Sequence, residues 1–393
     1  MLDDHIPLDG HAALTVILPT YVLLFVEAAL VQVPGTRKTR VAILPCGLFL
    51  LWRYASVDQT SLFAESLKSR LTYFNLGNIT ITLTLAMQLA THAVAPGPYY
   101  RTDSTPHKVN KSMTQLLRDA GDLMFNARGI GWKWGVSIPI PSFTTQRWRA
   151  IRWSALSFAL HTVLVDIVLC IMYAINPALR APEGTSMYED DRGAPLSPLS
   201  TTAITFCMGT IIYAAVVYPY DLVRMVALLA GGDPARWPPL FDAPWAATSL
   251  ADFWGRRWHQ MFRYSFATLG AAPARELGRR LGGRWLGRVA GLFGAFTLSS
   301  VLHSWGLHGM GRGGDAFRIS VFFLMMAVGI SLEDAWRRWT GRGVGGLVGW
   351  LWTFGWLLGW GHFLVEAYCQ KGIAGALWFR IVSFSVYGVP QTA

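Results

Sequence analysis

Nine apolar stretches, most of them close to 20 residues long, run through this chain and constrain its fold more than any other feature. A helix needs about 20 consecutive apolar residues to cross the hydrocarbon core of a bilayer, so each stretch is a candidate membrane span. The stretches cover residues 12–33, 41–55, 72–95, 153–175, 199–220, 286–308, 317–335, 344–367 and 372–388, of which the second and the last are short or interrupted. We therefore predict about 8–9 transmembrane helices.

The amino-acid composition also indicates a membrane protein. Of the 393 residues, 52% are hydrophobic and only 15% are charged, whereas a soluble domain carries about 25% charged residues. No internal repeat is evident, which argues against transporter folds built from duplicated halves. The predicted fold class is an all-α polytopic membrane protein, a bundle of transmembrane helices with interfacial amphipathic helices, forming a single integral-membrane domain over residues 1–393.

The charge distribution predicts a topology. The net charge is +11, and basic residues gather in 37–40, 101–152, 236–288 and 337–342, whereas 176–198 is acidic. The basic connections alternate along the chain, so the positive-inside tendency places them in the cytosol and the N-terminus in the lumen. We expect a multi-pass protein of the endoplasmic reticulum. Because the basic residues flank spans, membrane lipid is an expected partner and nucleic acid is not.

The connection over residues 96–152 is polar at first and then becomes amphipathic. Apolar residues there are interleaved with Arg and Lys, and they include Leu117, Leu123, Met124, Phe125, Trp132 and Trp134. This pattern predicts a helix lying in the membrane interface, ended by the break at Pro139 and Pro141.

Residues 239–260 are too polar for a membrane span and too rich in tryptophan for an ordinary loop. Thr248 or Ser249 can cap a helix that begins near Leu250, and Asp252 would then lie in its first turn. Such a helix would carry one stripe of side chains at helical spacing. The stripe consists of Phe253, Trp254, Arg257, Trp258 and Met261.

This segment has two interpretations. Tryptophan prefers the headgroup zone of a membrane, so the stripe fits an interfacial anchor. Polar side chains concentrated among the tryptophans fit a functional site equally well. The residues of that candidate site are Trp245, Asp252, Trp254, Arg256, Arg257, Trp258 and His259.

A lone histidine, His303, lies in the apolar stretch 286–308. Ionisable groups within membrane helices are costly and are functional-site hypotheses by default. The alternative is a hydrogen-bonded core histidine without a chemical role. Small residues on the same stretch would either let a neighbouring helix approach closely or leave room for a ligand channel. They are Gly291, Gly294, Ala295, Ser299 and Ser300.

A histidine in apolar surroundings stays neutral and can act as a general base. It could take the proton of a substrate hydroxyl that attacks a thioester carbonyl, while Arg257, Trp258 and His259 bind or polarise the thioester. Basic cytosolic connections suit an anionic carrier such as coenzyme A. No nucleophile elbow, Walker loop, dinucleotide fingerprint or HExxH motif is present, and no metal is required.

Three motifs, Pro239-Leu-Phe-Asp-Ala-Pro-Trp245, Ser249-Leu-Ala-Asp-Phe-Trp-Gly-Arg-Arg-Trp-His259 and Ser300-Val-Leu-His303, resemble in this order the wax synthase-like branch of the membrane-bound O-acyltransferase family. The resemblance covers residues 236–310. It implies acyl transfer from acyl-CoA to an alcohol within a bundle of membrane helices. It also implies that His303 is the catalytic base.

The second polar position of the family falls at His259, where plant-type members generally carry Asn and fungal-looking members carry His. Both side chains can donate a hydrogen bond, but only the imidazole titrates. His259 is therefore either a hydrogen-bond donor or a second acid/base. The expected substrate-binding residues are Asp252, Trp254, Arg256, Arg257 and Trp258.

The histidine variant favours the fungal natural-product group, in which acetyl-CoA is the co-substrate and the acceptor is a lipophilic terpenoid or meroterpenoid alcohol of secondary metabolism. One alternative is a long-chain acyl-CoA:fatty alcohol wax-ester synthase. A second is a membrane-bound terpenoid cyclase, which would need Asp166 or Glu366 as its acid. A third is a transporter or lipid-binding protein. No bound cofactor is expected, and the oligomeric state stays open.

Overall fold

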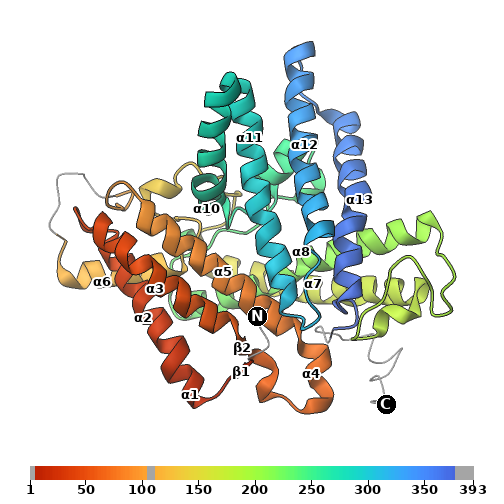
Figure 1. The fold of residues 1–393 in the computed structure, drawn as a ribbon, viewed down its shortest axis with the longest axis horizontal. Helices are drawn as coiled ribbons and strands as arrows, with labels where there is room; N and C mark the ends of the chain where they lie inside the picture. Colours follow the sequence, from red (N-terminus) through yellow and green to blue (C-terminus); the bar gives the residue numbers. More distant parts are fainter. Residues whose placement is uncertain (1–4, 104–110, 377–393) are drawn as a thin grey trace. The chain divides into compact units, whose positions relative to one another are not determined.

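The computed structural model describes residues 5–103 and 111–376, and these residues are mainly helical (Figure 1). The only strands among them are β1 (Ile6–Pro7) and β2 (Val57–Asp58), which pair in parallel. Contacts divide the chain into two compact units. The first unit comprises residues 1–63, 74–139 and 260–309, and the second comprises 64–73, 140–259 and 310–393.

The first unit is built around α2, which packs against α3 and α6. Its apolar core includes Ala28, Val31, Leu89 and Leu123, each at most 1% exposed. The unit contains the helices α1 (Gly10–Ala12), η1 (Ala13–Ile17), α2 (Leu18–Leu30), α3 (Arg37–Ala55), η2 (Gln59–Leu62), α5 (Tyr73–Val94), α6 (Met113–Phe125), η3 (Lys133–Gly135), α10 (Arg263–Ser265), η8 (Phe266–Ala271) and α11 (Ala272–His308).

Residues 263–308 form a helical hairpin in the first unit (Figure 1). The chain reverses at Gly282 and Gly283, and Gly283 takes a φ of 76° that favours glycine. The two arms touch through glycines: a Cβ on Gly294 would overlap the carbonyl oxygen of Gly270. Gly291 likewise faces Ala271 and Arg275. The close approach predicted from the small residues is therefore confirmed, and the basic residues 263–281 form the opposing arm.

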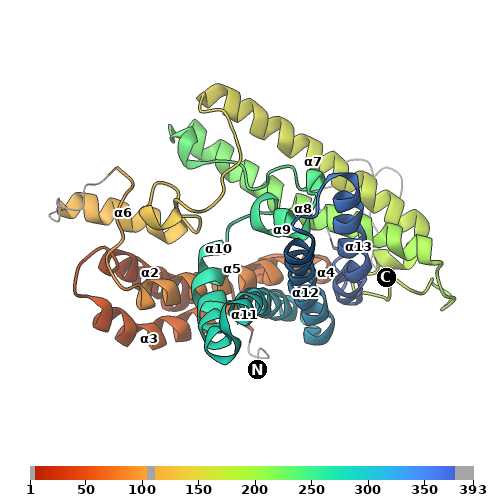
Figure 2. The same cartoon turned by 90° about the horizontal axis from the view of Figure 1, so that it is seen from above.

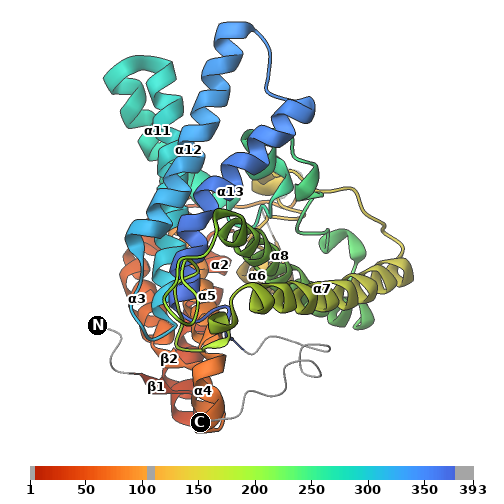
Figure 3. The same cartoon turned by 90° about the vertical axis from the view of Figure 1, so that its right-hand side faces the viewer.

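The second unit has two pairs of long helices. α7 lies beside α8 (Figure 2), and α12 lies beside α13 (Figure 3). The helices of this unit are α4 (Glu65–Leu71), α7 (Arg147–Ile175), η4 (Pro177–Arg180), α8 (Pro198–Leu229), η5 (Pro234–Arg236), η6 (Pro244–Ala246), α9 (Leu250–Asp252), η7 (Phe253–Arg257), α12 (Ala316–Thr340) and α13 (Gly346–Gln370). α13 also contacts α8.

Five helical segments among the described residues are long and apolar enough to cross a membrane. They are Gly10–Leu30, Arg147–Ile175, Pro198–Leu229, Arg263–His308 and Ala316–Thr340. The predicted spans 41–55, 72–95 and 344–367 are helical, as α3, α5 and α13, but do not belong to these five. Most of the predicted span 372–388 lies outside the described residues. The helical membrane fold is supported, whereas the count of 8–9 spans is not confirmed.

The predicted amphipathic helix is α6, capped by the Ser112 hydroxyl. It ends at Phe125, so the prediction that the helix continues through Trp132 and Trp134 to the break at Pro139 is wrong. Trp132 is fully buried, and its indole Nε1 donates to Asp122 over 2.7 Å. The Arg101 guanidinium lies 4.3 Å from the Trp132 ring. Trp132 is thus a core residue of the first unit.

Candidate functional site

The tryptophan-rich segment begins as predicted and then departs from the α-helix. Ser249 caps α9, and its hydroxyl accepts the Asp252 amide over 2.9 Å. The chain then widens into the single π-helical turn η7, and Trp258 is extended, with a φ of −70° and a ψ of 153°. The predicted stripe through Trp258 and Met261 is therefore wrong, because helical spacing ends at Arg257. Single π turns are common at functional sites.

A carboxylate from another helix supports the start of this segment. Glu333 of α12 is 7% exposed. Its two oxygens accept from the amides of Leu250 and Ala251 over 2.6 and 3.0 Å, and also from the Trp352 indole over 2.9 Å. A buried anion here satisfies helix-terminal amides that would otherwise be unpaired. The sequence analysis did not single out Glu333, although a carboxylate in the apolar stretch 317–335 was a signal for it.

The arginines of the motif are held by acidic side chains and by the backbone. Asp252 accepts from Arg256 Nε over 2.8 Å and from Arg257 Nε over 2.5 Å. Arg257 Nη1 donates to the carbonyls of Asp242 and Ala243 over 2.9 and 3.1 Å. Ala243 has a φ of 44°, a left-handed conformation that is strained for a residue with a Cβ. These contacts lower the pKa of Asp252 below its usual value, against the opposing effect of burial.

We predict that Arg257→Lys destabilises the protein and slows its activity, whereas Arg256→Ala has little effect on stability. The Arg257 side chain is 15% exposed and bridges one carboxylate and two carbonyls, which a lysine ammonium cannot match. Its loss should cost about 1.5–3 kcal/mol. Arg256 is 49% exposed, and its ion pairs should contribute less than about 1 kcal/mol. Thermal unfolding in detergent measures both variants. If Arg257→Lys and Arg256→Ala lose equal stability, the claim that the contacts of Arg257 stabilise the protein more than those of Arg256 is contradicted.

Aromatic rings surround the end of the motif. The His259 ring lies 5.6 Å from Phe241 and 5.7 Å from Trp258, measured between ring centroids. Trp258 stacks on Phe253 at 5.2 Å, and Trp254 lies 5.8 Å from Trp258. The predicted residues Asp252, Trp254, Arg256, Arg257, Trp258 and His259 are therefore brought together in the second unit. Trp245 is 62% exposed and lies at the edge of this group.

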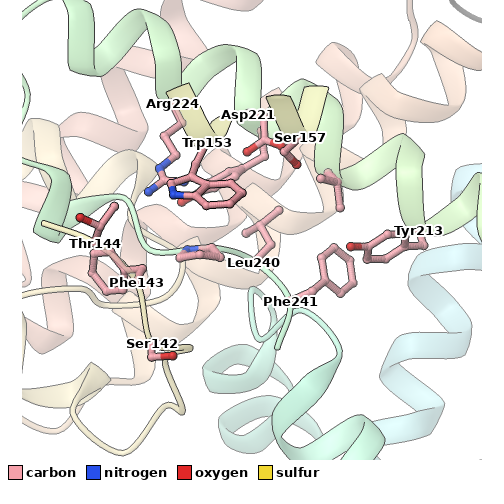
Figure 4. A pocket seen from close by; sticks show the side chains of 13 residues that line it. Ser142, Phe143, Thr144, Trp153, Ser157, Tyr213, Asp221, Arg224, Leu240 and Phe241 are labelled. Atoms are coloured by element: carbon pink, nitrogen blue, oxygen red, sulfur yellow. The ribbon is translucent and has the colours of Figure 1, made fainter. Parts of the chain in front are cut away.

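A cavity of about 350 Å³ lies in the second unit, and of the residues named above Phe241 lines it (Figure 4). One wall is formed by Pro239, Leu240 and Phe241 from the start of the motif. The opposite walls come from α7 and α8. Its polar residues on α8, Asp221 and Arg224, were not singled out in the sequence, because the predicted span ended at residue 220 whereas α8 continues to Leu229.

His303 lies in α11, on the second arm of the hairpin, and thus in the first unit. Its Nδ1 lies 2.8 Å from the carbonyl oxygen of Ser299. Because a carbonyl can only accept, Nδ1 carries the hydrogen in this contact, and a neutral imidazole then keeps its lone pair on Nε2. One turn further on, Gly306 lies against Thr80 of α5.

Comparison with known proteins matches the site region. Residues 237–325 match the model of the Membrane bound O-acyl transferase family. The chain is 37% identical over 129 residues to Acetyltransferase spyB of Aspergillus fumigatus, covering 32% of this chain and 22% of that protein. It is 26% identical over 258 residues to Acetyltransferase ple2 of Rhodocybe pseudopiperita, covering 63% and 65%. It is 32% identical over 121 residues to Probable long-chain-alcohol O-fatty-acyltransferase 7 of Arabidopsis thaliana, covering 29% and 35%.

The chain spans less than two thirds of the length of each of these relatives. The segment that matches the family nevertheless contains the Trp-rich motif, the hairpin and His303. It also overlaps the range 236–310 on which the resemblance was based. Through this segment, the chain is similar to the Membrane bound O-acyl transferase family and to the fungal and plant acyltransferases named above.

Proposed function

We propose that this protein is an O-acyltransferase that moves an acyl group from acyl-CoA to the hydroxyl of a lipophilic alcohol. The observation that carries the proposal is the His303 imidazole, with Nδ1 bonded to Ser299 inside the family segment. This bond orients the ring and leaves Nε2 as its basic nitrogen. An imidazole held in this way is suited to general-base catalysis.

In the proposed step, the alcohol oxygen attacks the thioester carbonyl carbon as Nε2 of His303 takes the hydroxyl proton. The carbon–sulfur bond then breaks, and coenzyme A leaves as a thiolate that recovers this proton from the imidazolium. One ester and one free thiol form, and the histidine returns to its neutral state. The step balances in atoms and electrons without a metal or a redox partner.

The motif residues of the second unit are the proposed binding groups for the acyl donor. Arg256 keeps a half-exposed guanidinium that can meet an anionic carrier. The rings of Trp254 and Trp258 offer apolar surface for the donor. The ion pair between Asp252 and Arg257 stabilises the conformation of the segment. His259, flanked by two rings, serves either as a hydrogen-bond donor to the thioester or as a second acid/base.

The names of the fungal relatives support acetyl-CoA as the donor, and we propose a terpenoid or meroterpenoid alcohol of secondary metabolism as the acceptor. Two of the fungal relatives are named acetyltransferases. The Arabidopsis relative, named for long-chain alcohols, favours the wax-ester synthase as second candidate. We also propose a multi-pass location in the endoplasmic reticulum with a lumenal N-terminus, and a single integral-membrane domain over residues 1–393.

The terpenoid-cyclase alternative is less well supported. Such an enzyme needs a carboxylic acid that donates a proton, for which Asp166 and Glu366 were the candidates. Glu366 accepts the Met187 amide over 2.8 Å and the Gln370 side-chain amide over 2.6 Å, one on each oxygen. Both carboxyl oxygens of Glu366 are thus engaged by amide donors of the chain itself.

The proposal is tested with purified protein in lipid, given radiolabelled acetyl-CoA or palmitoyl-CoA and a panel of terpenoid and fatty alcohols. We expect labelled ester from acetyl-CoA and a terpenoid alcohol, with release of free coenzyme A. Product from palmitoyl-CoA and hexadecanol alone would support the wax-ester synthase instead. Consumption of an isoprenoid substrate without any thioester would contradict acyl transfer.

A further inference from the structure

The cavity in the second unit has mostly apolar walls, with the hydroxyl residues Ser142, Thr144 and Ser157 and one charged end (Figure 4). Its volume of about 350 Å³ is within the range of small-molecule sites. Aromatic and aliphatic side chains make up most of its lining, and they are Phe143, Trp153, Tyr213, Val217, Tyr220, Pro239, Leu240 and Phe241. Such a lining fits a lipophilic molecule rather than a chain of waters.

The polar end is formed by Asp221 and Arg224, which are only 6% and 5% exposed. They are three residues apart on α8, so their side chains share one helix face. Arg224 Nη1 donates to the Ser154 hydroxyl over 3.2 Å. Asp221 Oδ2 and Arg224 Nε, however, have no hydrogen-bond partner within the described part of the chain.

Buried polar atoms that lack a partner are costly, so a site of this kind is complete only when a ligand supplies the missing bonds. Here one atom is an acceptor, Asp221 Oδ2, and the other is a donor, Arg224 Nε. A hydroxyl group meets both needs, because it donates one hydrogen and accepts another. A phosphate or carboxylate would instead be repelled by Asp221.

We propose that this cavity binds the acceptor alcohol, with the hydroxyl at Asp221 and Arg224 and the hydrocarbon body against the aromatic wall. The inference rests on the proposed function for the identity of the ligand as the acceptor. The site itself is defined by the two buried charged residues, whatever reaction the protein catalyses. Asp221 and Arg224 bind the alcohol before the reaction, because its single hydroxyl hydrogen is donated to Asp221 there and must leave that contact before His303 Nε2 takes it.

The test is photo-crosslinking with a farnesol analogue that carries a diazirine, in the absence of any thioester. We expect labelled peptides from the walls of the cavity, at residues 153–157, 213–224 and 239–241. Unlabelled farnesol should compete at least about tenfold more strongly than farnesyl methyl ether, which cannot donate to Asp221. Asp221→Asn should reduce this preference to about threefold or less, because the hydrogen bond loses its charged partner.

Asp233→Asn is the matched control, since Asp233 is an exposed carboxylate that caps η5 and asparagine caps equally well. Asp233→Asn should keep the full preference for farnesol over farnesyl methyl ether, and Asp221→Leu should abolish this preference. Labelling outside the cavity, or equal competition by the ether, would overturn the proposal; the second result would mean that water fills the polar end. Correct labelling without acyl transfer from any thioester would refute the proposed function and leave the alcohol site standing.

Discussion

Replacing His303 with alanine is expected to reduce acyl transfer by about 10²–10⁴-fold, the usual contribution of a general base. The reason is that Nε2 carries the lone pair of the neutral ring when Nδ1 donates to the Ser299 carbonyl. The effect should fall on kcat more than on KM, because the proton moves in the transition state. Steady-state rates with purified, folded protein measure both constants.

His308→Ala is the control for this substitution. His308 lies on the same helix, is exposed, and contacts the Trp305 ring at 5.8 Å. It should retain nearly the activity of the unmodified protein. If His303→Ala inserts and purifies normally and still turns over at the normal rate, His303 is a core histidine and not the base.

Replacing Glu333 with leucine is expected to destabilise the second unit by about 3 kcal/mol, which is a large effect for one residue. The leucine would leave the amides of Leu250 and Ala251 and the Trp352 indole without their acceptor in a buried place. Because the Leu250 and Ala251 amides begin the Trp-rich segment, activity should fall together with stability. Thermal unfolding in detergent and the acyl-transfer rate are the two measurements.

Asp334→Asn is the control for this substitution, because it tests whether loss of the neighbouring carboxylate on α12 has the same effect on stability. Asp334 is the next residue and pairs with Arg338 over 2.7 Å at an intermediate exposure. Partly exposed pairs of this kind contribute little, so its unfolding temperature should stay close to normal. If Glu333→Leu unfolds at the same temperature as Asp334→Asn, the amides of α9 do not depend on the buried anion.

Local signals predicted part of the site well. The Ser249 cap follows from its side-chain oxygen and the helix-forming residues after it, and the structure confirms it. The small residues Gly291 and Gly294 predicted a close helix neighbour, which is the other arm of the hairpin. Both predictions rest on residues within one helical turn of each other, Ser249 before Leu250 and Gly291 with Gly294, which is why the sequence pattern reveals them.

Features that depend on distant contacts could not be predicted. The helical stripe through Trp258 fails because the chain leaves the α-helix at η7, and periodicity carries no information about a π turn. The Leu250 amide donates to the carboxylate of Glu333, which lies 83 residues further along the chain. Hydropathy placed a boundary at residue 220, so Asp221 and Arg224 were taken for part of a connection although α8 continues past them.

The central claim is that the alcohol oxygen of the acceptor attacks the thioester carbonyl. The most direct measurement uses farnesol labelled with ¹⁸O, acetyl-CoA and the purified protein, with mass spectrometry of the ester. The mechanism predicts that the ester keeps the heavy oxygen and that one free coenzyme A forms for each ester. An ester without the label, or farnesol consumed without release of coenzyme A, would contradict acyl transfer to the hydroxyl.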